Sequence, residues 1–292
     1  PAKGLPMSTE AERAAVRSAY AKTVTAENPD AAVEAAFARV PRENYLGPGP
    51  WPIVRGWGVY GETASADPIH LYTDALFGIV PERGLNNGQP SLHANWLAHA
   101  KPEPGEHVVH IGAGWGYYTA IMAEMVGRGG RVTGIEFESD LAARAQANLA
   151  DYPNVAVIAG DGAAAAFDTA DVIYVNAGVT HPAEAWLDRL NDGGRLVLPL
   201  TTADNITNSD VSTIATRGAV YLITRTGDDY GAEWISSVAV YPSAGARDSA
   251  AERALAAALA TGRARDVTRL RRAPVQPDER VFVRWPQACL AF

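Results

Sequence analysis

The feature that most constrains the fold is a glycine turn, Gly112-Ala113-Gly114-Trp115-Gly116, set between the apolar run 108–111 and the apolar segment 120–126. This order predicts a strand, a tight turn and a helix, because side chains on the turn would hold the backbone away from a bound ligand. A second apolar run ends at Glu136, about 20 positions beyond Gly116, where nucleotide-binding βαβ units place a carboxylate against ribose hydroxyls. The unit therefore predicts a pocket for an adenosine-type cofactor.

The spacing of the glycines indicates which cofactor. Dinucleotide sites have G-x-G-x-x-G, whereas this chain has G-x-G-x-G and places Tyr117 where that pattern wants the last glycine. Without a pyrophosphate at the helix start, a cofactor with adenosine and an amino-acid tail fits better. The spacing resembles the first motif of class I methyltransferases, which bind S-adenosylmethionine. A purely structural glycine turn is the alternative.

Composition limits the class of protein. The chain has 292 residues, 20% of them charged and 47% hydrophobic, as in soluble globular proteins. A net charge of −8 argues against a general nucleic-acid binder. The sequence has no apolar run of membrane-spanning length, and we expect no secretion leader, no membrane partner and a cytoplasmic location. The lone Cys289 offers neither an internal disulfide nor a metal cluster, so no metal is expected.

The middle of the chain alternates strands with helices. Strands are predicted at 108–111, 131–135, 155–158, 171–175 and 195–200, and helices at 120–126, 140–150 and 182–190. This rhythm predicts an α/β fold, a doubly wound and mostly parallel sheet with helices on both faces. Gly112, Glu136, Asp161 and Asn176 all fall at strand ends. Because parallel sheets bind ligands at the carboxyl ends of their strands, one crevice is expected to collect all four.

The N-terminal part predicts helices and loops. Helices are expected at 9–27, at 31–40 with Asp30 as N-cap, and at 92–100 with Ser91 as N-cap. In the second helix, Val33, Ala36, Phe37 and Val40 recur at helical spacing and should face a core. The proline- and glycine-rich passage up to Gly61 holds Trp51, Trp57 and Tyr60. These rings either fold back over a core edge, the preferred interpretation, or bind substrate.

Beyond residue 201 the pattern changes to strand after strand. Antiparallel edge strands are predicted at 212–216, 219–224 and 234–241, then a helix at 249–260 and a strand at 281–283. A basic patch consists of Arg263, Arg265, Arg269, Arg271 and Arg272, and we interpret it as a solvated helix face rather than a phosphate contact. We divide the chain into 1–6, a cloning remnant before Met7, 7–100, a helical and loop region, 101–245, the cofactor-binding core, and 246–292, a C-terminal helix and tail.

Several segments resemble protein-L-isoaspartate O-methyltransferase, and together they cover roughly residues 37–201. They are Val40-Pro41-Arg42-Glu43-Asn44-Tyr45-Leu46, Tyr72-Thr73-Asp74, Gly88-Gln89-Pro90-Ser91-Leu92-His93-Ala94, the glycine turn, Asn154-Val155, Gly160-Asp161-Gly162, Asp171-Val172-Ile173-Tyr174-Val175, and Gly193-Gly194-Arg195-Leu196-Val197-Leu198-Pro199. The chain looks like a divergent member of this family.

The resemblance implies roles for the matched positions. Ile111 and the glycine turn would pass under the methionine part of S-adenosylmethionine, and Glu136 would accept both ribose hydroxyls. Phe137 would lie against the adenine, whose amino group would meet Asp161 and Gly162. His93 matches a histidine that lines the cofactor site in some members, and Asn176 completes the set. Taken one at a time, Glu136 also fits a solvated strand end, Asp161 a helix cap and His93 a packed helix histidine.

The implied reaction is methyl transfer from a sulfonium to a carboxylate of a protein, peptide or small molecule. A carboxylate is ionised at neutral pH, so orientation and exclusion of water matter more than a general base. The family has a Thr-Ile-Ser triplet before the proline, and its serine is thought to position the acceptor. This chain has Asn86-Asn87-Gly88, so Gly88 stands in place of the serine and the catalytic residue is unassigned. Either Asn86, Asn87 or Ser91 supplies the donor, or the substrate is different.

Three functions remain open at this point. The first is an S-adenosylmethionine-dependent O-methyltransferase with a carboxylate acceptor, or with another acceptor. The second is a cofactor-binding adaptor that has lost catalysis with the serine. The third is a nicotinamide-dependent oxidoreductase, which Tyr117 disfavours.

Overall fold

The computed structural model describes residues 7–56, 59–203, 211–276 and 278–292. The parallel strands are β5 (His107–Ile111), β6 (Arg131–Glu136), β7 (Val155–Ala159), β8 (Ala170–Val175) and β9 (Leu190–Thr201). They pair in the order β9-β8-β5-β6-β7. The chain runs outward from β5 to β7 and then returns to β8 on the other side of β5. This reversal makes the carboxyl ends of β5 and β8 the switch point where such sheets bind ligands.

Antiparallel strands extend the sheet on the β9 side. They are β10 (Gly218–Thr226), β11 (Asp229–Ser237), β12 (Arg269–Arg272), β14 (Ala288–Ala291) and β13 (Val281–Arg284). The sheet reaches ten strands, in the order β13-β14-β12-β11-β10-β9-β8-β5-β6-β7. The prediction of a strand at 212–216 is wrong, because Val211–Thr216 forms a 3₁₀ helix. Strands β12 and β14 were not predicted, and β11 begins and ends earlier than expected.

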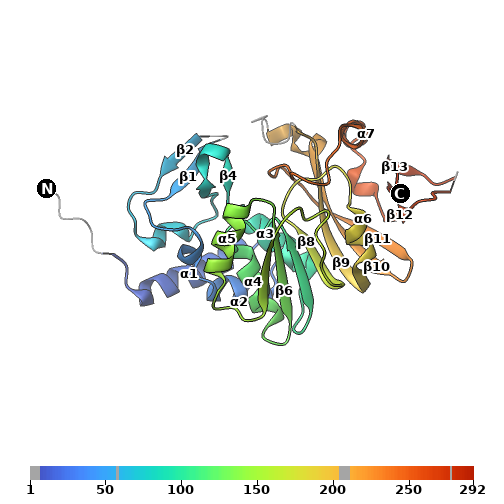
Figure 1. Cartoon of the computed structure of the whole chain (residues 1–292). Helices are drawn as coiled ribbons and strands as arrows, with labels where there is room; N and C mark the ends of the chain where they lie inside the picture. The colour runs from blue at the N-terminus through green and yellow to red at the C-terminus, as the bar shows by residue number, and fades with distance from the viewer. Residues whose placement is uncertain (1–6, 57–58, 204–210, 277) are drawn as a thin grey trace.

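Helices cover both faces of the sheet. One face carries α1 (Glu10–Val24), α2 (Ala31–Arg39), α3 (Pro90–Ala100), α4 (Tyr117–Val126) and α5 (Ser139–Asn148), and the other carries α6 (Glu184–Asp188) and α7 (Ser249–Ala260). Figure 1 shows α6 and α7 on the side away from α4 and α5. Successive residues of β5 point to opposite faces of the sheet. Val108 packs in the hydrophobic core under α1–α5, and Val109 packs in the core under α6 and α7. The predicted doubly wound architecture is confirmed, although α6 is shorter than the predicted helix over 182–190.

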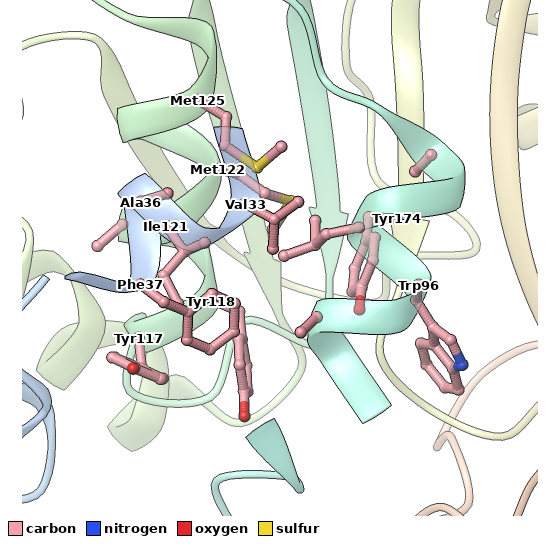
Figure 2. Packing of buried hydrophobic residues seen from close by; sticks show 14 of the residues in the cluster. Val33, Ala36, Phe37, Trp96, Tyr117, Tyr118, Ile121, Met122, Met125 and Tyr174 are labelled. Carbon is pink, nitrogen blue, oxygen red and sulfur yellow. The ribbon is translucent and has the colours of Figure 1, made fainter. Parts of the chain in front are cut away.

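The N-terminal helices pack through aromatic rings. Asp30 caps α2 by accepting hydrogen bonds from the backbone of Ala32 and Val33, as predicted, and the helix buries Val33, Ala36 and Phe37. Phe37 contacts Tyr117 edge-on, with ring centroids 6.2 Å apart, and also packs against Tyr118 of α4 (Figure 2). Tyr117 is therefore a core residue of the first face.

Two small hairpins stand beside the carboxyl end of the sheet. The first is β1 (Pro52–Gly56) with β2 (Val59–Glu62), and the second is β3 (Gly78–Val80) with β4 (Leu85–Asn86). A bridge between Ile53 and Phe77 joins them, and Figure 1 shows both on the N-terminal side of the molecule. Trp51 is buried beneath them, as the fold-back interpretation predicts. Trp57 lies outside the described residues, as do residues 1–6.

Arg42 ties this N-terminal region together. Its side chain is fully buried and donates to the carbonyl oxygens of Leu71 (2.7 Å), Thr73 (2.9 Å) and Ala75 (2.8 Å). The guanidinium also lies over the ring of Phe77, 4.9 Å from its centroid. A buried charge is tolerated here because carbonyl dipoles and a π-face replace its water shell. The segment that leads into β3 is thereby held against the helices.

Candidate active site

A cavity of about 1190 Å³ opens at the carboxyl ends of the parallel strands. Its walls come from the hairpins, the glycine turn and the segment after β11. Among the residues predicted to bind the cofactor, those that line it are His93, Ile111, Gly112, Ala113, Gly114, Trp115, Glu136, Phe137, Asp161, Gly162 and Asn176. Residues from four different strand ends thus meet in one place, as the doubly wound topology requires.

The glycine turn needs its glycines for close packing as well as for conformation. Gly112 has φ +81°, and a Cβ there would lie 3.1 Å from the carbonyl oxygen of Asn176. Gly116 has φ +94°, and a Cβ there would lie 2.7 Å from Leu149 Cδ1. Gly116 is the one predicted cofactor residue that is not among the cavity-lining residues. Its role is to let α4 start close to the end of α5.

Glu136 ends β6 with its carboxylate inside the cavity. Oε2 accepts a hydrogen bond from Gly114 N (2.7 Å) and Oε1 accepts one from Glu138 N (3.1 Å). Burial raises the pKa of Glu136, while these backbone donors act in the opposite direction. Each oxygen keeps a lone pair for a further donor. A vicinal diol, with its two hydroxyl donors, suits this arrangement.

Asp161 follows β7 and is covered by the segment after β11. Oδ1 accepts a hydrogen bond from Ala163 N at 2.9 Å, and no partner of Oδ2 is found in the described residues. Gly245 packs so closely that a Cβ on it would lie 2.7 Å from Asp161 Cγ. Gly162 next to it has no space for a Cβ either, because Ile111 fills that space. Asp161 caps the short turn that follows it, since Ala164 N and Ala165 N donate to its carbonyl oxygen, and it keeps Oδ2 as a further acceptor on the cavity wall.

Asn176 and Phe137 complete the cofactor side of the cavity. Asn176 Nδ2 donates to the carbonyl oxygen of Gly112 at 3.3 Å, which joins the end of β8 to the glycine turn. Phe137 follows Glu136 and is 52% exposed. Such exposure of a phenyl ring on a cavity wall leaves its face free to stack on a planar ligand.

His93 lies on α3 and lines the cavity. It is buried, stacks on Tyr118 with ring centroids 3.7 Å apart, and has Nδ1 2.8 Å from the hydroxyl of Tyr174. Burial lowers the pKa of His93 well below its usual value, and the nearby His110 and Arg42 act in the same direction. The imidazole is neutral at pH 7, so it offers one N–H donor and one acceptor.

The three residues that could replace the missing serine differ in whether they line the cavity. Asn86 and Asn87 line the cavity together with Gly88, whereas Ser91 is not among the lining residues. Ser91 N donates to Asp74 Oδ1 (2.8 Å) and its hydroxyl donates to Asp74 Oδ2 (2.7 Å). The prediction that Ser91 caps α3 is also wrong. The helix begins at Pro90, and the side chain of Gln89 makes no capping hydrogen bond. The free backbone N–H of Ser91 in the first turn donates instead to the carboxylate of Asp74, which comes from another segment.

Several cavity residues were missed by the sequence reasoning. Arg83, after β3, pairs with Glu138 (2.7 Å) and approaches Asp140 (3.5 Å). The strap, residues 238–248, follows β11 and contributes Tyr241 and Gly245 to the cavity wall. The strap is fixed to residue 178, since Gly178 N donates to Tyr241 O and Ser243 N donates to Gly178 O, both at 2.8 Å. No local pattern marks these residues, because their partners lie far away in the sequence.

The basic patch is not a helix face. Helix α7 ends at Ala260, and Arg269, Arg271 and Arg272 lie on β12. Four of the five arginines pair with acids, namely Arg263 with Asp266, Arg269 with Glu279, Arg271 with Asp229 and Arg272 with Asp188. Arg265 lies over Trp234, 4.3 Å from the ring centroid. Acidic side chains therefore pair with most of the patch, and three of its arginines lie on the added strand β12.

The described residues contain neither a metal-binding cluster nor a membrane-spanning helix. No group of three or more His, Cys, Asp or Glu side chains is arranged to hold a metal ion there. Among the helices of the described part, none has both the length and the apolar character needed to cross a membrane.

Comparison with known proteins identifies a family that this chain matches. The family model described as protein-L-isoaspartate(D-aspartate) O-methyltransferase matches residues 65–223. A protein-L-isoaspartate O-methyltransferase of Thermotoga maritima is 30% identical over 171 residues, which are 56% of this chain and 49% of the relative. One of Aeropyrum pernix is 38% identical over 126 residues, 41% of this chain and 48% of the relative. The chain thus spans about half the length of these relatives.

Solved structures show the same fold. A protein-L-isoaspartate O-methyltransferase superposes with a TM-score of 0.63 at 23% identity, over 78% of this chain and 66% of the other. A putative protein-L-isoaspartate O-methyltransferase from Plasmodium falciparum, solved in complex with S-adenosyl-L-homocysteine, gives 0.58 at 19% identity, over 77% of this chain and 97% of the other. The predicted Rossmann-like fold is confirmed. Because the family model covers more than half of its residues, the chain belongs to the protein-L-isoaspartate(D-aspartate) O-methyltransferase family.

Proposed function

We propose that this protein is an S-adenosylmethionine-dependent O-methyltransferase whose acceptor is a carboxylate of a protein, peptide or small molecule. The observation that carries the proposal is the convergence of the glycine turn, Glu136 and Asp161 on one cavity. Family membership and the fold support it. Residues 101–245 would form the cofactor-binding core, with 7–100 and 246–292 packed on it.

The polar groups of the cavity fit the proposed cofactor. Glu136 would accept the two ribose hydroxyls with the lone pairs left by its backbone partners. Asp161, whose Oδ2 has no partner among the described residues, would accept the adenine amino group beside Gly245. Phe137 would stack on the adenine, and Gly112 to Gly114 would run under the methionine part. When bound, S-adenosylmethionine supplies a methyl group on a positively charged sulfur.

The chain's own contribution to the reaction would be orientation and exclusion of water. An acceptor carboxylate needs no deprotonation at neutral pH, since its reference pKa is about 4. The buried imidazole of His93 is neutral and is therefore suited to donate a hydrogen bond rather than to take up a proton. Rates would depend on holding the carboxylate in line with the methyl group, since orientation of this kind can supply about 7–11 kcal/mol of the barrier.

The test has a binding arm and a turnover arm. Titration calorimetry with S-adenosylhomocysteine should give a 1:1 complex, and Glu136→Gln should weaken it. Formation of S-adenosylhomocysteine from S-adenosylmethionine should then be followed with an isoaspartyl peptide and with the aspartyl peptide of the same sequence. Methylation of either peptide supports the proposal. Binding without turnover on any carboxylate would favour a non-catalytic adaptor, and no binding would contradict the proposal.

A further inference from the structure

Position 88 leaves an opening in the cavity wall that His93 fills. Gly88 has φ +75°, and a Cβ on it would overlap Nε2 of His93 and lie 2.9 Å from its Cδ2 and 3.3 Å from Tyr118 Cε2. Tyr118 also donates from its hydroxyl to Gly88 O at 3.1 Å. The ring of His93 thus occupies the space that any side chain at position 88 would need. Its Nε2 points toward Gly88 and has no hydrogen-bond partner within the described part of the chain.

The tautomer of His93 follows from its other nitrogen. Tyr174 is fully buried, and its hydroxyl has Nδ1 of His93 as its hydrogen-bond partner, at 2.8 Å. A buried phenol must give its proton to an acceptor, and Nδ1 is the acceptor within reach among the described residues. Tyr174 therefore donates to Nδ1, and the neutral ring carries its own proton on Nε2. The cavity end of His93 is consequently an N–H donor.

Asn87 provides a second donor next to the same glycine. Its Oδ1 accepts a hydrogen bond from Phe77 N at 2.9 Å, which fixes the orientation of the side-chain amide. The Nδ2 group of Asn87 is buried and has no hydrogen-bond partner among the described residues. Both Asn87 and His93 line the cavity. A buried amide donor without a partner is costly, and a ligand acceptor would remove that cost.

We propose that the Nε2–H of His93 and the Nδ2–H of Asn87 form a two-donor seat for the carboxylate of the methyl acceptor, on either side of Gly88. A carboxylate has two oxygens that only accept hydrogen bonds, so it matches two donors. The seat would lie on the part of the cavity wall formed by Asn87, Gly88 and His93, whereas adenine is assigned to Asp161. The proposal rests on the proposed function and assigns to the acceptor a histidine that the family resemblance connects with the cofactor.

Matched substitutions at His93 test the position of the donor. The amide nitrogen of His93→Gln reaches the place of Nε2, whereas that of His93→Asn reaches only the place of Nδ1. With the better of the two peptide acceptors, His93→Asn should lower kcat/KM by about 10- to 150-fold, the effect of losing a hydrogen bond to a charged group. His93→Gln should recover most of that loss. Equal losses in the two variants would overturn the assignment.

A second substitution tests the seat from the Asn87 side. Asn87→Asp keeps the oxygen that accepts from Phe77 but replaces the donor by a negative charge. It should raise KM for the peptide by more than His93→Asn does, because like charges repel in a partly buried site. Thermal unfolding of each variant checks the fold. If Asn87→Asp leaves KM unchanged, Asn87 is not part of the seat.

Calorimetry separates this proposal from the cofactor assignment. The Kd of S-adenosylhomocysteine should stay within about twofold in all three variants. A large rise in that Kd with unchanged KM for the peptide would place His93 on the cofactor and overturn the seat. If the unaltered protein binds S-adenosylhomocysteine but methylates neither peptide, the proposed acceptor fails.

If neither peptide is methylated, an NMR measurement that needs no turnover can still test the seat. Nitrogen-15 NMR of the histidine-labelled protein in complex with S-adenosylhomocysteine should show the Nε2–H tautomer for His93. Addition of the isoaspartyl peptide should shift the Nε2 proton downfield. The Nδ1–H tautomer, or an Nε2 signal that does not respond to the peptide, would contradict the seat.

Discussion

The hydroxyl of Tyr241 donates a hydrogen bond to the carbonyl oxygen of Arg83 at 3.3 Å, and this contact joins the C-terminal strap to the N-terminal hairpin. The guanidinium of the same arginine pairs with Glu138, 2.7 Å away and two positions after the proposed ribose ligand. Both Arg83 and Tyr241 line the cavity. Three segments that are distant in sequence thus meet at one residue beside the adenosine end of the site. We call Arg83, Glu138, Asp140 and Tyr241 the latch.

The latch should slow the exchange of cofactor. Substitution Arg83→Gln removes the ion pairs with Glu138 and Asp140, and the dissociation rate of S-adenosylhomocysteine should rise about 2- to 5-fold, as expected for partly exposed pairs. The difference should shrink at high salt. Stopped-flow displacement measures the rate. Arg131→Gln, which breaks the exposed pair with Asp168 (2.9 Å) at the start of β6, is the control and should leave the rate unchanged.

Gly245 should be needed for adenine binding rather than for folding. In Gly245→Ala the new Cβ would lie 2.7 Å from Asp161 Cγ, so the carboxylate would have to move. The Kd of S-adenosylhomocysteine should rise about tenfold or more, because a hydrogen bond to a charged group is lost. Gly129→Ala is the matched control, since nothing lies within 4 Å of a Cβ there. An unchanged Kd in Gly245→Ala would remove Asp161 from the adenine site.

The parts of the site that could be predicted are those with local causes. Gly112, Glu136 and Asp161 each stand at or just after the end of an apolar strand, and the parallel topology brings strand ends together whatever the details of packing. The same is true of Asp30, whose cap position depends on its own neighbours. The structural role of each of these residues is determined by residues within a few positions of it in the sequence.

The parts that could not be predicted depend on partners elsewhere in the chain. Tyr241 and Arg83 are 158 positions apart, and neither has a local signal for the contact. Ser91 looks like an N-cap by sequence, but Asp74, 17 positions earlier, competes for its donors. Strands β12 and β14 pair with each other, and β12 joins the sheet through β11. Contacts with distant parts of the chain, rather than the local sequence, determine each of these features.

Cofactor binding should depend on pH through Glu136. Burial raises the pKa of this carboxyl above its usual value of 4.5, so it takes up a proton at a higher pH than an exposed glutamate does. Protonation removes one acceptor for the ribose hydroxyls. The affinity for S-adenosylhomocysteine should therefore fall as the pH is lowered through that pKa, and it should be constant at higher pH.

Calorimetry between pH 7.5 and the acid limit of the folded state would measure this effect. Glu136→Gln should bind more weakly at pH 7.5, by about 10- to 150-fold, and its affinity should vary less with pH. If the variant and the unaltered protein showed the same dependence on pH, another group would be responsible.

His110 should make the folded state sensitive to acid. It is fully buried on β5, its Nδ1 lies 2.8 Å from Thr119 Oγ1, and its Nε2 has no partner among the described residues. Burial lowers the pKa of His110 to about 3. The unfolded chain, with a histidine pKa of about 6.5, binds this proton first, so stability is lost as the pH falls below 6.5. One such group contributes about 2 kcal/mol of lost stability between pH 6.5 and 4.5.

Substitution of His110 by asparagine tests this contribution. His110→Asn keeps a polar group near Thr119 but does not titrate, so it should be less stable than the unaltered protein at pH 7.5 because of the cavity that it leaves. Its free energy of unfolding should then fall less steeply between pH 6.5 and 4.5. Denaturant titrations at several pH values give both curves, and their difference isolates His110 from the carboxylates and from His93, which titrate in both proteins. Parallel curves over this range would show that His110 does not take up its proton on unfolding.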